Sequence, residues 1–563
     1  MERCGEFGQI EYSETLEDLR ESLVQLNFQL VRTNEDKLHI LEKRMREVLL
    51  RLKQENDKEL LGILFKMTLH VRDIFQGKGE CLLFYMMVLV WYEFYPECAK
   101  SALYCSVFSL LPDKKSLGSW KDVKYFCNYC LKKTENEFHP LIEYLIKITN
   151  DELRKEYENK INTNYSTRQK SFVAKWIPRE KSKQFGWLNK KLATNYFIEY
   201  IKTSFDKWRR IKATKKAQTE YRRIVSELNK KLDIIETRQC EKQLFNINYL
   251  NIPSLTMLKQ RKSFLNLNKD GVTERTDEPE RIVAASFFKE HLSMYNYISG
   301  QTINLLQFGK EALKPNNSPF EKKLINKQWK DSSLKIKTLR SMIPILDCSQ
   351  KMLEDDAIYG AMALACKIAE KSIIGKRILC FSSYPIWVNF DDEDCEAGFT
   401  GMMEFLYKKI KNGIGLTNNL HGALDELLEI IEECKLSVES VEEMMLIIIS
   451  GMQFEKDASG WKNDTLYKMI KNKFNLVGMS TTNKLYHPPH ICFWNVKQVN
   501  GFPSSSNDRN VSMMSGFSQL QLNAFRENIT QEPKICTPWS MLSTMLNKKR
   551  YNIVKDVIEN YLE

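Results

Sequence analysis

The sequence has no apolar run long enough to cross a membrane. Its longest such run, Cys81 to Tyr92, falls short of the ~20 residues that a membrane helix needs. The first residues include Glu2, Arg3 and Glu6, where a signal peptide would have an apolar core. Glycine (22) and proline (15) are scarce, while 28% of residues are charged and 43% are hydrophobic, so extended disorder and collagen-like structure are excluded. We expect no membrane partner.

The sequence also lacks the common catalytic motifs. It contains no Walker loop, no Gly-x-Ser-x-Gly elbow, no HExxH motif and no dinucleotide fingerprint after a strand. His487 and His490 flank two prolines without a placed carboxylate or nucleophile, and we interpret them as loop residues. These absences predict a protein that is not an enzyme.

Paired cysteine motifs are nearly absent as well. The fourteen cysteines are scattered singly among apolar neighbours, which is typical of reduced, buried thiols in the cytosol or nucleus. One close pair, Cys127-x-x-Cys130, has no second pair at zinc-finger spacing. We therefore expect a cytoplasmic protein without a structural zinc site.

The chain has 563 residues, which is enough for two to four domains. From residue 14 to about 250, leucines such as Leu23, Leu26 and Leu30 recur at helical spacing. The apolar segment 82–111 predicts two buried helices joined near the Tyr95-Pro96 step. This pattern predicts an all-α part built from irregular helical repeats, although no fixed repeat period is visible.

Strand-length apolar runs alternate with helical stretches after about Ser332. Examples are Met342–Leu346, Met444–Ser450 and His490–Val496, and their continuous apolar character predicts a mostly parallel, doubly wound sheet covered by helices. We therefore expect a multidomain protein with three segments. They are an α-helical domain (1–264), a linker with connecting helices (265–331), and an α/β domain with C-terminal helices (332–563).

The positive charge is concentrated in one stretch. The chain has a net charge of +12, and Lys202–Lys231 contains eleven basic and three acidic residues, an excess of eight. On one long helix, such residues could neutralise phosphates while Trp208 or Tyr221 stacks on a base. The candidate phosphate contacts are Lys207, Arg209, Arg210, Lys212, Lys215, Lys216, Arg222 and Arg223. The alternative is a solvated helix face, with Ile211, Ile224 and Leu228 turned toward the core.

A second basic and aromatic segment spans Tyr165–Lys191. Its lysines and arginines lie near Trp176 and Trp187, and Lys175 and Trp176 are our candidates for nucleic-acid contact there. The alternative is a connection between helices that buried tryptophans hold in place.

The first predicted strand of the α/β part ends in Asp347-Cys348-Ser349-Gln350-Lys351. This loop resembles the Asp-x-Ser-x-Ser loop of von Willebrand factor A domains, whose oxygen ligands hold Mg²⁺ in a metal-ion-dependent adhesion site. Gly415-Leu416-Thr417-Asn418 resembles the Gly-x-Thr loop of the same domains, and Leu446–Ser450 resembles the strand before their final metal-site aspartate.

Further blocks occur in the same order as in one particular family. They are Gly118-Ser119-Trp120-Lys121-Asp122, Lys175-Trp176-Ile177-Pro178, Gly451-Met452-Gln453-Phe454-Glu455, Phe493-Trp494-Asn495 and Ser515-Gly516-Phe517-Ser518. The chain thereby resembles an uncharacterised family of plants, fungi and large DNA viruses that joins a helical domain to a von Willebrand A-like domain. The layout is also similar, more distantly, to the Ro autoantigen and other TROVE-module proteins, which bind structured RNA.

Two positions depart from the metal-site pattern. Asp347, Ser349 and Thr417 match it, but Lys351 stands at the second serine position and Gly451 at the final aspartate position. Because an ammonium group opposes a divalent cation, we expect a degenerate site without metal and no cofactor, with Mg²⁺ the one candidate ion. Asp347 would then serve as a cap or in an ion pair.

These observations predict a non-enzymatic protein that binds RNA or a ribonucleoprotein on its basic helical surface. The competing class is a structural or assembly protein that self-associates or contacts a protein partner. The family resemblance and the Asn- and Lys-rich composition suggest a viral origin, in which case the virion is a second candidate location.

Overall fold

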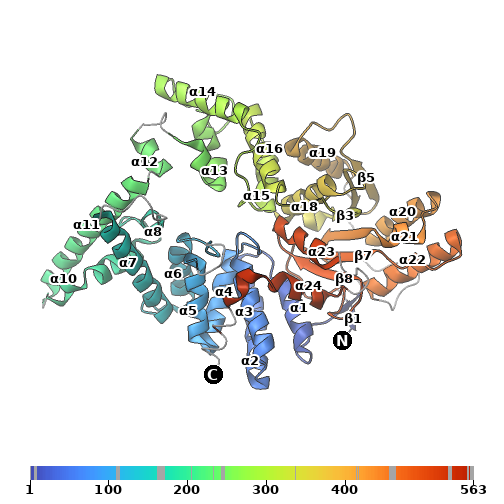
Figure 1. The fold of residues 1–563 in the computed structure, drawn as a ribbon, viewed down its shortest axis with the longest axis horizontal. Coiled ribbons are helices and arrows are strands. Elements are labelled where there is room, and N and C mark those ends of the chain that lie inside the picture. The colour runs from blue at the N-terminus through green and yellow to red at the C-terminus, as the bar shows by residue number, and fades with distance from the viewer. Residues whose placement is uncertain are drawn as a thin grey trace. The chain divides into compact units, whose positions relative to one another are not determined.

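Figure 1 shows the computed structural model, which divides into two compact units. It describes residues 2–4, 9–109, 115–161, 171–203, 206–232, 234–241, 247–336, 338–413, 415, 418–454, 465–529, 536–553 and 557. The sheet unit comprises Met1–Leu83 and Leu250–Lys555, and the helical unit comprises Phe84–Tyr249 and Asp556–Glu563. These two units do not coincide with the expected domains 1–264, 265–331 and 332–563. The boundaries of those domains stay a prediction.

The sheet unit is built around six strands in the order β5-β4-β3-β6-β7-β8. All neighbouring pairs are parallel except β5, which runs antiparallel to β4 at the edge. The structure therefore confirms a helical N-terminal part followed by an α/β sheet. The strands are β3 (Met342–Asp347), β4 (Arg377–Phe381), β5 (Pro385–Asn389), β6 (Met445–Ser450), β7 (His490–Asn495) and β8 (Val511–Ser515).

The central strands are apolar on both faces because helices cover them. Every residue of β3, β6, β7 and β8 is buried. Helix α18 (Ala357–Lys371) is rich in small residues and is buried over most of its length. The other helices after β3 are α17 (Gln350–Leu353), α19 (Phe399–Asn412), α20 (Leu420–Glu433), α21 (Val438–Glu442), α22 (Leu466–Thr482), α23 (Leu522–Ile529) and α24 (Pro538–Leu546).

The first helices of the chain belong to the sheet unit. Asp18 caps α1 (Leu19–Gln29) by accepting hydrogen bonds from the backbone N–H groups of Arg20 and Glu21. At its other end, the carbonyl of Phe28 accepts a 2.8 Å hydrogen bond from Asn495 Nδ2, directly at the end of β7. The neighbouring elements are β1 (Glu2–Cys4), β2 (Ile10–Tyr12), η1 (Glu35–Lys37), α2 (Leu38–Glu55) and α3 (Lys58–Arg72).

The segment before β3 also contributes helices to this unit. Ser318 and Glu321 form a capping box at the start of α16 (Pro319–Ser333), where Pro319 occupies the first helical position. The other helices of the segment are α13 (Ser254–Phe264), α14 (Pro279–Met294) and α15 (Leu305–Ala312), the last of which packs against α18.

The helical unit confirms the expected helices of the middle of the chain. The apolar segment 82–111 forms α4 (Cys81–Phe94) and α5 (Pro96–Val107), separated at Tyr95 as the Tyr95-Pro96 step predicts. The following helices are α6 (Lys121–Thr134), α7 (Pro140–Ile161), α8 (Val173–Trp176), α9 (Gly186–Tyr196), α10 (Ile198–Lys202), α11 (Lys207–Leu232) and α12 (Ile235–Cys240). Their assignment as repeats stays a prediction.

Candidate functional site

The basic stretch forms α11, and its first two turns are exposed on every side. All six residues from Lys207 to Lys212 are exposed, and Trp208 has 66% of its surface accessible. The ammonium of Lys212 lies 5.3 Å from the centroid of the Trp208 ring. A large aromatic side chain and four basic residues therefore share this exposed end of the helix.

The remainder of α11 is anchored in the core of the helical unit. Ala217, Tyr221, Ile224 and Leu228 are buried at helical spacing. Tyr221 donates a 3.0 Å hydrogen bond from its hydroxyl to Asn150 Oδ1, and burial raises the pKa of that hydroxyl well above its ordinary value. Tyr221 is therefore a core residue and not a stacking platform. Ile224 and Leu228 lie in the core as the alternative interpretation expects, whereas Ile211 is 41% exposed.

Several basic residues of α11 are paired with carboxylates. Arg209 Nε lies 3.2 Å from Asp206 Oδ2, Arg222 Nη1 lies 3.3 Å from Glu180, and Arg223 Nη1 lies 3.0 Å from Glu220. Such exposed pairs are weak and exchange readily with solvent or a ligand. Lys215 and Lys216 are exposed on the next turn, and the Lys216 ammonium lies 4.4 Å from the centroid of the Tyr200 ring.

Lys175 and Trp176 lie at the other end of α11. Asn229 Nδ2 donates a 3.3 Å hydrogen bond to the carbonyl of Ala174, which holds α8 against the C-terminal half of α11. At 1.5 Å per residue, Lys207 and Asn229 are about 33 Å apart along the helix. The structure therefore places Lys207–Lys216 and the pair Lys175–Trp176 at opposite ends of one helix, whereas Arg222 and Arg223 belong to its C-terminal half. Lys175 pairs with Glu236 at 3.4 Å, and its side chain is only 14% exposed. Glu236 therefore already balances part of the charge of Lys175.

Trp176 belongs to an aromatic–lysine cluster that the sequence did not single out as a unit. The ammonium of Lys124 lies 4.9 Å from the Trp176 centroid, 5.6 Å from that of Tyr125 and 5.5 Å from that of Phe185. Burial, together with the nearby charge of Lys121, lowers the pKa of Lys124. Lys121, Lys124 and Tyr125 stand at helical spacing in α6. This spacing is the feature of the sequence from which part of the cluster could have been predicted.

The second candidate site lies at the carboxyl ends of the central strands. Asp347 ends β3, is 1% exposed, and accepts a 3.0 Å hydrogen bond on Oδ1 from the backbone N–H of Ser349. Its Oδ2 accepts hydrogen bonds from Ser450 Oγ at 2.5 Å and from Asn418 Nδ2 at 2.9 Å. Burial raises the pKa of Asp347, and these hydrogen bonds oppose that shift. The cluster lies between β3 and β6, where the order of strands along the chain reverses and doubly wound sheets bind ligands.

Among the residues that the structure describes, those around Asp347 do not fit a Mg²⁺ ion. Mg²⁺ needs several oxygen ligands in octahedral geometry, whereas both carboxylate oxygens here accept hydrogen bonds from N–H and O–H donors. Asn418 Oδ1 is a buried oxygen with no hydrogen-bond partner in the described residues, and one amide oxygen does not complete a ligand set. Thr417, the third matching position, lies outside the described residues.

Both positions that depart from the metal-site pattern, Lys351 and Gly451, lie beside Lys497. Lys351 is exposed on α17. A Cβ at Gly451 would lie 3.2 Å from Cδ of Lys497. Lys497 Nζ donates a 2.9 Å hydrogen bond to the carbonyl of Lys351 and lies 3.3 Å from Asp355 Oδ2. The Lys497 side chain thus fills the space beside Gly451 and links the loops that follow β3 and β7. No group of three or more His, Cys, Asp or Glu residues that could hold a metal occurs within the ranges described above.

The cysteine pair and His490 are core residues. Cys127 and Cys130 are both buried on α6, and burial raises the pKa of Cys130 to about 11 and that of Cys127 well above its ordinary value. His490 was interpreted as a loop residue, and this interpretation is wrong. It is the first residue of β7, buried, with its Nε2 3.0 Å from Ser512 Oγ.

Comparison with known proteins gives two matches. Residues 341–552 match a family model described as a domain of unknown function, DUF7788. This range contains all six strands of the sheet. Over 479 residues the chain is also 23% identical to an uncharacterized protein of Acanthamoeba polyphaga mimivirus, with 81% of this chain and 75% of that protein covered. The second match is a similarity to a protein of a large DNA virus.

In the described part of the chain, no helix is both long enough and apolar enough to cross a membrane.

Proposed function

We propose that the protein binds RNA, without catalysis, through the exposed end of α11. The observation that carries this proposal is the run Lys207–Lys212, in which four basic side chains and the 66% exposed Trp208 are all open to solvent. Positive side chains neutralise phosphates, and an exposed indole can stack on an unpaired base. The aromatic–lysine cluster of Trp176, about 33 Å away along the helix, supports a second contact with an extended strand.

We further propose that the sheet unit carries a von Willebrand A-like domain with a degenerate adhesion site. The strand order, with an antiparallel edge strand, supports this assignment. The polar cluster at Asp347 would then hold the loops after β3 and β6 together by hydrogen bonds where relatives use a metal. In this proposal the domain is a scaffold, and the layout is similar to that of TROVE-module proteins.

A salt titration with matched variants tests the RNA proposal. The test variant carries Arg210→Glu, Lys212→Glu and Lys215→Glu, all exposed on α11. The control carries Lys37→Glu, Lys43→Glu and Lys58→Glu, which make the same charge change at exposed sites of the sheet unit. We expect the test variant to lose most affinity for single-stranded RNA and the slope of log K against log [salt] to fall by about two, since each phosphate contact contributes about 0.7.

The Trp208→Ala variant separates stacking from charge. We expect its affinity for RNA to fall about tenfold, because stacking on one base contributes about 1–3 kcal/mol, while the salt slope stays unchanged. Circular dichroism of each variant serves as the control for folding. Equal loss in the test and control variants would contradict the proposal. So would the absence of RNA binding by the unmodified chain at low salt, and a defined oligomer in that sample would favour the assembly class.

A further inference from the structure

A groove in the sheet unit lies between the loop that follows α15 and the C-terminal end of α19. Its volume is about 490 Å³, within the range of about 300–1,000 Å³ that small-molecule sites span. Leu313, Pro315 and the ring of Tyr407 supply apolar lining. The same groove is lined by four lysines, Lys314, Lys322, Lys408 and Lys411.

The four lysines differ in how their charge is balanced. Lys314 Nζ lies 2.8 Å from both carboxylate oxygens of Glu311, and Lys322 Nζ lies 2.8 Å from Glu404 Oε2. Lys408 and Lys411 are exposed and have no carboxylate partner in the residues that the structure describes. The Lys411 ammonium lies 5.2 Å from the centroid of the Tyr407 ring. The groove therefore carries uncompensated positive charge beside an aromatic ring.

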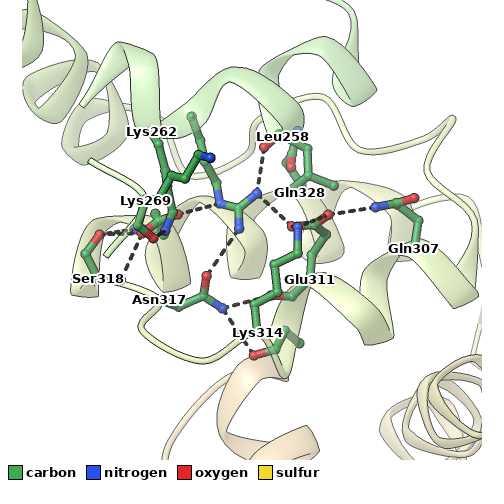
Figure 2. A network of polar contacts seen from close by, with 12 residues as sticks. Leu258, Lys262, Lys269, Gln307, Glu311, Lys314, Asn317, Ser318 and Gln328 are labelled. Atoms are coloured by element: carbon green, nitrogen blue, oxygen red, sulfur yellow. Dashed lines mark hydrogen bonds and ion pairs between the residues drawn. The ribbon is translucent and has the colours of Figure 1, made fainter. Parts of the chain in front are cut away.

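One wall of the groove is held in place by a buried polar network (Figure 2). Arg261, which is 3% exposed, makes a 2.7 Å ion pair with Glu311 and a 2.8 Å ion pair with Glu321. Its Nη2 also donates a 3.2 Å hydrogen bond to Asn317 Oδ1, and Asn317 Nδ2 donates to the carbonyl of Glu311 at 2.8 Å. The loop that presents Leu313 to Pro315 is thus fixed before any ligand arrives, which lowers the entropic cost of binding.

Stabilisation of α19 explains only part of this arrangement. Lysines in the last turns of a helix interact favourably with the carbonyl end of its dipole, which accounts for Lys408 and Lys411 as members of α19. Lys314 and Lys322 come from a different part of the chain and line the same groove, where Glu311 and Glu404 balance their charge.

We propose that this groove binds a nucleoside polyphosphate. The phosphates would lie at Lys408 and Lys411, and the base would lie against Leu313, Pro315 and Tyr407. Ammonium groups without carboxylate partners attract phosphate oxygens by charge-assisted hydrogen bonds, and an aromatic face with apolar neighbours suits a planar base. The proposal concerns binding alone and does not depend on the RNA proposal for α11.

Isothermal titration calorimetry of the full chain with ATP, in EDTA and at low salt, tests this site. Lys408→Glu and Lys411→Glu should each weaken ATP binding at least tenfold. The matched control is Lys409→Glu, an exposed residue of the same helix that does not line the groove. It should change ATP affinity less than threefold. Adenosine and inorganic pyrophosphate, titrated separately, should each bind more weakly than ATP, because each supplies only one part of the contact.

The α11 variant with Arg210→Glu, Lys212→Glu and Lys215→Glu should keep its ATP affinity, which separates this site from the RNA surface. The proposal is overturned if the unmodified chain shows no saturable ATP binding, or if Lys409→Glu weakens binding as much as Lys411→Glu. Loss of ATP binding in the α11 variant alone would overturn it as well.

Discussion

His490 lies inside the sheet unit as a neutral residue, and this has a consequence for acid stability. Burial lowers the pKa of its imidazole to about 4 from an ordinary value of 6.5. Between these two values the unfolded chain binds the proton and the folded chain does not. The free energy of unfolding therefore falls as the pH drops from about 6.5 to about 4, and the stability contribution is fully present only above that window.

The variant His490→Gln should flatten this dependence. Between pH 7 and pH 5 we expect the free energy of unfolding to fall by about 2 kcal/mol less in the variant than in the unmodified chain, measured by urea denaturation. His39→Gln, at an exposed position of α2, is the control and should keep the unmodified profile. Parallel pH profiles for His490→Gln and the unmodified chain would show that His490 is protonated in the folded state.

At the candidate sites, sequence reasoning identified residue types better than their roles. The chain order places Asp347 at a strand end, so its position in the sheet could be predicted. Its partners could not, because Asn418 and Ser450 are 71 and 103 residues away and meet it only through the fold. On α11, charge density was visible in the sequence, but only packing distinguishes the buried Tyr221 from the exposed Trp208.

The element α11 combines a buried stripe with an exposed basic end. Leu228→Ala should destabilise the helical unit by about 2–4 kcal/mol, because it removes a side chain that is 2% exposed and leaves a cavity. Hydrogen exchange should show faster exchange in α7, α9 and α11. Ile211→Ala, at a 41% exposed position of the same helix, should leave exchange within the helical unit nearly unchanged. Equal acceleration in both variants would contradict the anchoring role of Leu228.

Strands whose residues form a nearly continuous apolar run were the easiest elements to predict. Strands β3, β6 and β7 are mostly apolar runs, and their bounds agree with the predicted ones to within one residue. Helix α22 spans Leu466–Thr482. Its later turns contain Asn472, Asn475 and Gly478, which have low helix propensity, and packing of Phe474 into the core overrides that preference.

At the scale of the whole molecule, the compact units do not follow the order of the chain. The helices α1–α3 join the sheet unit, 250 or more residues before the first strand of the sheet. Their amphipathic pattern predicts helices but carries no information about which surface they cover. A buried lysine, Lys78, shows how the contact is made: its Nζ donates to the carbonyl of Asn27 and to Ser515 Oγ of β8, each at 2.6 Å.

A buried ion pair also joins the two ends of the sheet unit. Arg550 Nε lies 2.7 Å from Asp73 Oδ2, and the Tyr551 hydroxyl donates a 2.9 Å hydrogen bond to the same oxygen. Asp73 follows α3 and is fully buried, while Arg550 is 4% exposed. Residues 477 positions apart in the sequence are thus joined, so the fold of this unit depends on both the early and the late parts of the chain.

Arg550→Met should therefore lower the free energy of unfolding of the sheet unit by about 3–5 kcal/mol, because the Asp73 carboxylate would stay buried without its cation. The double variant Asp73→Asn and Arg550→Met should lose less than the sum of the two single variants, which urea denaturation measures as a coupling free energy. Arg281→Met breaks a partly exposed pair with Glu278 in the same unit and should cost less than about 1 kcal/mol. Additive losses in the double variant would show that the two ends are not joined through this pair.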